Sequence, residues 1–167
     1  SYMLEYSLVG GLTASGCDVY LLHVTTTPCV SFITRTDEFD CGIMISASHN
    51  PYYDNGIKLL NSRGEKTDDR LIMLIEDYLD SFDASLPFAS RKSIGKIVDH
   101  TSGRNRYVGY LISSASHSFR TLKIGLDCAN GSSWNIAKSV FDALGAKTYV
   151  INAEPNGLNI NKNAGST

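Results

Sequence analysis

Residues 43–58 read IMISASHNPYYDNGIK, an apolar stretch that runs directly into a small, polar, turn-rich segment. Residues 42–46 predict a strand, and the segment behind it presents one hydroxyl, Ser48, followed directly by an imidazole, an amide and a proline. Lys58 follows ten positions after this serine, where the chain becomes apolar again. Because catalytic groups are often carried on loops held by a rigid scaffold, this stretch is a candidate platform for chemistry.

Outside this stretch, the hydrophobic periodicity alternates between helices and strands. The clearest helix, over residues 68–82, starts with two aspartates that suit the positive end of its dipole, and its apolar stripe is Leu71, Ile72, Ile75, Leu79 and Phe82. Further helices are predicted at 2–15, 29–34, 104–116 and 134–144, strands at 18–24, 57–60, 94–98, 122–126 and 147–151, and a linker at 81–91. This order predicts an α/β fold, with mixed, largely parallel sheets flanked by helices.

Two segments with the same order of features indicate that the fold repeats. Residues 12–20 and 141–149 each run from a helical pattern through a glycine, Gly16 or Gly145, into a strand pattern. We therefore expect successive similar domains, with the first over residues 1–120 and the start of the second over residues 121–167.

The composition of the 167-residue chain narrows the classes of function. Its net charge of −2 gives no electrostatic footprint for nucleic acid or a membrane surface, and no apolar run approaches the ~20 residues that cross a bilayer. We expect no signal peptide. The four cysteines form no Cys-x-x-Cys pair, which argues against zinc, and we expect each to be a small buried residue of a cytoplasmic protein.

Residues 43–58 resemble the active-site serine loop of the α-D-phosphohexomutase superfamily, and other segments extend the resemblance over most of the chain. These segments are Tyr2-Met3-Leu4-Glu5, Thr27-Pro28, Asp127-Cys128-Ala129-Asn130-Gly131 and Pro155-Asn156-Gly157-Leu158-Asn159-Ile160-Asn161. Residues 52–58 and 156–161 are most similar to the branch that interconverts glucosamine 6-phosphate and glucosamine 1-phosphate.

The resemblance implies that Ser48 carries a phosphoryl group, which it donates to a sugar monophosphate and takes back from the resulting sugar bisphosphate. It also implies Mg²⁺, bound to Ser48 through its phosphate, with aspartate ligands beyond the C-terminus of this chain. Glucosamine 1,6-bisphosphate is the implied primer and intermediate, and a homodimer is possible for the parent enzyme. From its residue type alone, without the resemblance, Ser48 is better explained as a turn residue that bonds to nearby backbone.

The resemblance assigns further roles around the serine. Lys58 lies where the superfamily has a proposed general acid or base, a role that needs a lowered pKa, although a lysine at a strand start is also commonly solvated. His49 is placed in the catalytic site, but adjacent side chains of an extended loop point apart, so a Ser–His pair is awkward. Asn50 is the candidate for substrate binding, while Pro51 beside it favours a loop-shaping role for both. Residues 127–133, between a strand and a helix, could bind phosphate but fit a scaffold role better.

Both ends of the chain look cut, so we expect a fragment of a longer enzyme. The superfamily's Asp-Gly-Asp-x-Asp-Arg metal loop does not occur in the sequence, and the fragment alone is predicted to be inactive. Branches that act on mannose or glucose phosphates, or a non-catalytic module that binds sugar phosphates, are the alternatives. A serine hydrolase is disfavoured because the chain has no G-x-S-x-G elbow.

Overall fold

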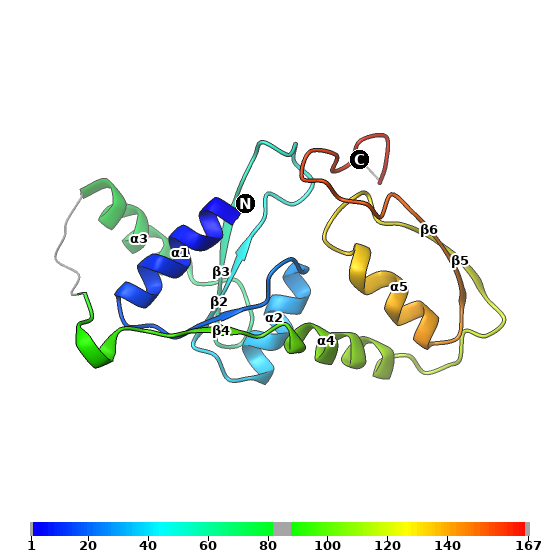
Figure 1. Cartoon of the computed structure of the whole chain (residues 1–167), viewed down its shortest axis with the longest axis horizontal. Helices are drawn as coiled ribbons and strands as arrows, with labels where there is room; N and C mark the ends of the chain where they lie inside the picture. The colour runs from blue at the N-terminus through cyan, green and yellow to red at the C-terminus, as the bar shows by residue number, and fades with distance from the viewer. Residues whose placement is uncertain (1, 82–87, 166–167) are drawn as a thin grey trace. The chain divides into compact units, whose positions relative to one another are not determined.

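The computed structural model describes residues 2–81 and 88–165 (Figure 1). The chain forms two compact units, each built from several segments. The first comprises Ser1–His23, Val30–Ser46 and Ile57–Thr101, and the second comprises Val24–Cys29, Ala47–Gly56 and Ser102–Thr167. Ser48 therefore belongs to the second unit, although the strands on either side of it belong to the first.

The described residues of the first unit form two small sheets. Strand β1 (Val19–Leu21) pairs in parallel with β4 (Ile97–Asp99), and β2 (Cys41–Ile45) pairs antiparallel with β3 (Ile57–Asn61). Helix α1 (Tyr2–Ala14) packs against β1. The other elements of this unit are α2 (Thr27–Thr36, from Val30 on), α3 (Asp69–Ser81) and the 3₁₀ turn η1 (Arg91–Ser93). Its buried apolar residues are Val9, Val30, Ile33 and Leu60.

The second unit contains a strand–helix–strand repeat. Strands β5 (Lys123–Asp127) and β6 (Lys147–Ile151) pair in parallel over their whole length, and α5 (Trp134–Ala143), which connects them, packs along both (Figure 1). Helix α4 (Ser102–Ser113) packs against α5. The buried apolar residues of this unit are Cys29, Tyr107, Cys128, Ile136 and Val140. The predicted α/β class is confirmed, because short parallel strand pairs are combined with flanking helices.

The two helix–glycine–strand segments found in the sequence end their helices in the same way. The N–H of Gly16 donates to Thr13 and that of Cys17 to Leu12, at 3.0 and 2.9 Å. At the end of α5, the corresponding bonds run from Gly145 to Asp142 and from Ala146 to Phe141, at 2.9 and 3.0 Å. Both glycines have a positive φ, 94° and 92°, so both helices close with a Schellman motif. The sequence similarity therefore reflects one local structure used twice.

Several predicted element bounds are wrong. The strand predicted at 18–24 is only Val19–Leu21, since the left-handed backbone of His23, with φ 54°, ends it. The strand predicted at 94–98 is Ile97–Asp99. The short helix predicted at 29–34 extends over Thr27–Thr36, because Pro28 lies in the first turn, where a missing N–H costs nothing.

Helix α3 forms as predicted, but its apolar stripe is not covered. No described residue of this helix is buried, and Leu71, Ile75 and Leu79 are 48%, 37% and 62% exposed. Phe82, the last residue of the predicted stripe, lies outside the described residues, as does most of the linker predicted at 81–91. Across residues 2–81 and 88–165, no helix is both long and apolar enough to span a membrane.

The expectation that all four cysteines are buried is wrong for two of them. Cys29 and Cys128 are buried, and this burial raises the pKa of both thiols. Cys17 and Cys41 are exposed. Cys17 directly follows the glycine that ends α1, and Cys41 is the first residue of β2, so both stand at the edges of elements.

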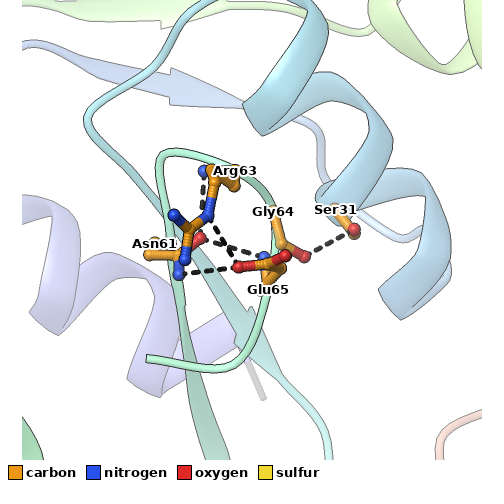
Figure 2. A network of polar contacts seen from close by, with 5 residues as sticks. All are labelled: Ser31, Asn61, Arg63, Gly64 and Glu65. Carbon is orange, nitrogen blue, oxygen red and sulfur yellow. Dashed lines mark hydrogen bonds and ion pairs between the residues drawn. The ribbon is translucent and has the colours of Figure 1, made fainter. Parts of the chain in front are cut away.

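The turn that follows β3 is fastened to helix α2 (Figure 2). The Asn61 side-chain oxygen accepts the backbone N–H groups of Arg63 and Glu65, at 2.9 and 3.1 Å, which closes the turn. Ser31 Oγ of α2 donates to the Gly64 carbonyl at 2.6 Å. Gly64 has φ 73°, and a Cβ there would overlap the Ser31 carbonyl. The β2–β3 hairpin is thus anchored to α2 at the end opposite the connection that carries Ser48.

We predict that Gly42→Ala destabilises the fold. Gly42 lies in β2 against α2, and a Cβ there would overlap Thr34 Oγ1 and approach Val30 Cγ1 to 3.2 Å. Thr34 is 2% exposed and its hydroxyl donates to the Val30 carbonyl at 2.8 Å, so it has no room to move. Overpacking of this kind costs about 1–3 kcal/mol, which a lowered urea midpoint of the purified chain measures.

Gly125→Ala in β5 is the matched control, because a Cβ there meets nothing within 4 Å. This substitution should be neutral or slightly stabilising. Equal urea midpoints for the two variants would contradict the predicted overlap in β2.

Candidate active site

The candidate site is built on Ala47–Gly56, the serine loop, which lies in the connection between β2 and β3. The antiparallel register of the two strands ends with the pair Ile45 and Ile57, so the ladder fixes both ends of this connection. Inside the loop, the N–H of Asn50 donates to the Ala47 carbonyl at 3.3 Å, and the N–H of Asp54 to the Pro51 carbonyl at 2.9 Å. The loop is therefore a series of two turns rather than an extended segment.

Ser48 stands in the first turn with a left-handed backbone. Its φ is 63°, a conformation that costs an L-residue about 1–2 kcal/mol, and its side chain is exposed. Non-glycine residues in this region persist where the surrounding structure holds them, and they cluster at functional sites. The conformation thus marks Ser48 as a residue whose placement is enforced.

The side chains of Ser48 and His49 approach each other, contrary to the expectation that they point apart. Ser48 Oγ lies 3.4 Å from His49 Nδ1. The left-handed backbone of Ser48 removes the alternation that an extended chain would impose. The separation is longer than that of a strong hydrogen bond, so this contact orients the hydroxyl only weakly.

Asn50 is engaged within the loop. Its side-chain amide donates to Asp54 Oδ2 at 3.1 Å, which joins the first turn to the second. This bond fits the loop-shaping interpretation of Asn50. Substrate binding by Asn50 stays a prediction.

Asn161, which the sequence analysis placed in a segment of family resemblance but gave no role in the site, contacts the serine loop from 112 positions away. Asn161 Nδ2 donates to the His49 carbonyl at 2.7 Å. Asn161 is part of an asparagine-rich segment, in which Asn152, Asn161 and Asn163 have positive φ values. Asparagine tolerates the left-handed region, so its high frequency here was the feature of the sequence that indicated an irregular, hydrogen-bonded backbone.

The carboxylate of Asp127, at the end of β5, accepts hydrogen bonds from three surrounding residues. It accepts the N–H of Gly165 at 2.9 Å, the N–H of Ala129 at 2.9 Å and the Asn152 amide at 3.0 Å. These hydrogen bonds, the one from Gly165 first, hold the pKa of Asp127 below its usual value. The bonds support the scaffold interpretation of residues 127–133.

Lys58 lies on β3, opposite Met44 of β2, and its side chain is exposed. It belongs to the first compact unit, whereas Ser48, His49 and Asn50 belong to the second. The structure therefore brings the serine, the histidine and the asparagine together in one loop, and the assignment of Lys58 to the same chemistry stays a prediction.

The residues described here do not form a cation site by themselves. No group of three or more His, Cys, Asp or Glu side chains within 2–81 and 88–165 is arranged to hold a metal ion. A phosphate on Ser48 would supply oxygen ligands for Mg²⁺, and the carboxylates that would join it stay a prediction.

Known proteins match this chain over its whole length. It is 65% identical over 167 residues to the phosphoglucosamine mutase of Lachnospira eligens and 62% identical to that of Lachnoclostridium phytofermentans, with 100% of this chain covered in both cases. The phosphoglucosamine mutase of Caldicellulosiruptor bescii is 48% identical over 99% of the chain. The chain spans 37% of the length of each of these relatives.

Residues 1–85 match the family described as phosphoglucomutase/phosphomannomutase, alpha/beta/alpha domain I. The chain belongs to this family. The resemblance drawn from residues 43–58 is thereby confirmed. A phosphoglucomutase/phosphomannomutase family protein from Burkholderia thailandensis has the same fold, with a TM-score of 0.74 and 24% identity over 92% of this chain and 33% of that one.

We predict that Asp127→Asn lowers the stability of the fold at neutral pH and makes that stability less sensitive to acidic pH. Because the folded-state pKa of Asp127 lies below the unfolded-state value, its contribution is complete above the unfolded-state pKa. That contribution is lost as the pH falls through the folded-state pKa. Urea midpoints measured from neutral to strongly acidic pH should converge for the original chain and the variant at the acidic end.

Asp77→Asn, on the exposed surface of α3, is the matched control and should leave the midpoint at neutral pH unchanged. An Asp127→Asn midpoint that stays parallel to the original at every pH would refute the role given to this carboxylate.

Proposed function

We propose that the whole protein containing these residues is a phosphosugar mutase that interconverts glucosamine 6-phosphate and glucosamine 1-phosphate. The observation that carries the proposal is the exposed hydroxyl of Ser48, held with φ 63° on a loop whose ends are fixed by the β2–β3 ladder. Membership of the phosphoglucomutase/phosphomannomutase family supports the reaction class. The phosphoglucosamine mutases at 48–65% identity support the amino sugar.

In the proposed reaction, Ser48 carries the phosphoryl group between two positions of the sugar. A hydroxyl of the sugar monophosphate attacks the phosphorus, the bond from phosphorus to Ser48 Oγ breaks, and a bisphosphate forms. After the sugar reorients, Ser48 Oγ attacks the other phosphate, which leaves the isomeric monophosphate. The proton lost by the attacking hydroxyl goes to a general base and returns to the departing oxygen, and Lys58 is the proposed carrier. His49 and Asn50 are proposed to contact the phosphate and the substrate.

The proposal includes partners that lie outside the described residues. Mg²⁺, which would neutralise charge on the transferred phosphate, is proposed to bind the phosphate on Ser48 together with carboxylates outside residues 1–167. Glucosamine 1,6-bisphosphate is the proposed primer. Residues 1–120 and 121–167 are proposed to belong to successive domains of a cytoplasmic enzyme that acts without nucleic acid or membrane. A homodimer is its proposed assembly.

A second candidate is a mutase that acts on glucose or mannose phosphates. The family that matches residues 1–85 takes its description from those two activities. The chemistry at Ser48 would be the same, and only the sugar would differ.

We predict that Ser48→Gly in the full-length protein abolishes both labelling by a radioactive sugar bisphosphate and mutase turnover. Glycine removes the hydroxyl but accepts the left-handed backbone, so the loop should keep its shape and the protein its melting temperature. Ser46→Ala, two positions earlier, should keep the label. A label that persists in Ser48→Gly would place the phosphoryl group elsewhere.

The same assay distinguishes the candidate sugars through kcat/KM for glucosamine 1-phosphate, glucose 1-phosphate and mannose 1-phosphate. The proposal requires the highest value for glucosamine 1-phosphate. A preference for either other sugar would favour the second candidate. The absence of both label and turnover would favour a non-catalytic module that binds sugar phosphates.

We further predict that residues 1–167, purified alone, do not turn over glucosamine 1-phosphate. The physical reason is that the Asp-Gly-Asp-x-Asp-Arg metal loop of the superfamily does not occur in the sequence, so the transferred phosphate would lack the cation that compensates its charge. A coupled assay with the full-length protein as positive control measures this. Mutase turnover by the 167-residue chain would contradict the proposal that carboxylates outside residues 1–167 are needed to bind Mg²⁺.

A further inference from the structure

A side chain from a distant part of the chain bonds to the serine loop at the residue that follows Ser48. The Asn161 amide donates to the His49 carbonyl at 2.7 Å. His49 directly follows Ser48, so a bond that fixes the His49 carbonyl restricts the backbone of His49 and thereby the turn in which Ser48 stands. Both partners belong to the second compact unit.

Asn161 is itself held in place by backbone bonds. Its N–H donates to the Ala129 carbonyl at 3.0 Å, and its backbone is left-handed, with φ 56°. Ala129, whose carbonyl accepts this bond, and Gly165 both donate a backbone N–H to the carboxylate of Asp127 at 2.9 Å. The side-chain amide that bonds to the serine loop therefore belongs to a residue whose backbone is held near the end of β5.

The chemistry of the contact suits a loop that carries a phosphate. A side-chain amide is a neutral donor, and it is spent here on a backbone carbonyl. A lysine or arginine in the same role would be drawn to the phosphate by a charge-assisted bond, and its contact with the carbonyl would then change as the phosphate is transferred. Asn161 therefore restrains the backbone without competing for the phosphoryl oxygens.

We propose that Asn161 is a positioning residue for phosphoryl transfer at Ser48, acting through the carbonyl of His49. This inference rests on the proposed mutase function and adds a residue to it. Misplacing a reacting group by about 1 Å can cost on the order of a hundredfold in rate, so a loosened His49 peptide should slow transfer while leaving the binding of the sugar largely intact.

The test is the rate constant for phosphoryl transfer from the phosphorylated full-length protein to glucosamine 1-phosphate, measured in a single turnover. Asn161→Asp keeps the shape and the tolerance for a left-handed backbone but replaces the donor with a carboxylate. Asn161→Gly keeps the backbone and removes the side chain, which covers the case in which the first variant does not fold. Each should lower the rate constant and kcat by about tenfold or more, with KM little changed.

Asn163→Asp is the matched control, because Asn163 lies two positions away with a similar backbone, φ 52°. It should transfer phosphate at the original rate. If the Asn161 variants lose melting temperature but their folded fraction transfers phosphate as fast as Asn163→Asp, the positioning role is overturned and the contact is structural. If the unsubstituted protein neither takes up the label at Ser48 nor turns over sugar phosphate, the proposed function fails, and this inference with it.

Discussion

The antiparallel ladder between β2 and β3 is the constraint on which the candidate site depends. It ends with the pair Ile45 and Ile57, and everything between these residues is a single excursion of the chain. Closing such a loop costs conformational entropy, which the ladder hydrogen bonds and the clamp of the following turn on Ser31 offset. With its ends fixed in this way, the loop can hold an energetically unfavourable backbone at Ser48.

Fixed ends alone do not determine the direction of a side chain three residues away. Two internal turns shorten the free part of the serine loop, and the Asn50–Asp54 contact joins them. The bond from Asn161 then restrains the carbonyl of His49, the residue that follows the serine. Because a left-handed serine relaxes wherever it is able to, φ 63° at Ser48 is best understood as the joint result of these restraints.

Features that depend on neighbouring residues could be predicted from the sequence. The strand–loop–strand at 42–60, the glycine stops at Gly16 and Gly145 and the α/β class follow from local patterns. Features that depend on distant partners could not. The residues near His49 do not indicate that a donor 112 positions away bonds to its carbonyl. The early end of the first predicted strand depends on the backbone angle of His23. The apolar stripe of α3 does not indicate whether another element buries it.

A phosphoserine site has to place the backbone of the serine and compensate the charge of its phosphate, and different groups perform these two tasks around Ser48. A phosphoserine brings a charge of about −1.5 to −2 at neutral pH, and a cationic side chain that held the backbone would be drawn to that charge instead of to the carbonyl. The side-chain donor that restrains this backbone is a neutral amide, and the carboxylate of Asp127 is occupied by donors from Ala129, Asn152 and Gly165. Placement of the backbone is thereby separated from compensation of charge, so the phosphate can leave without dismantling the loop that has to receive it again.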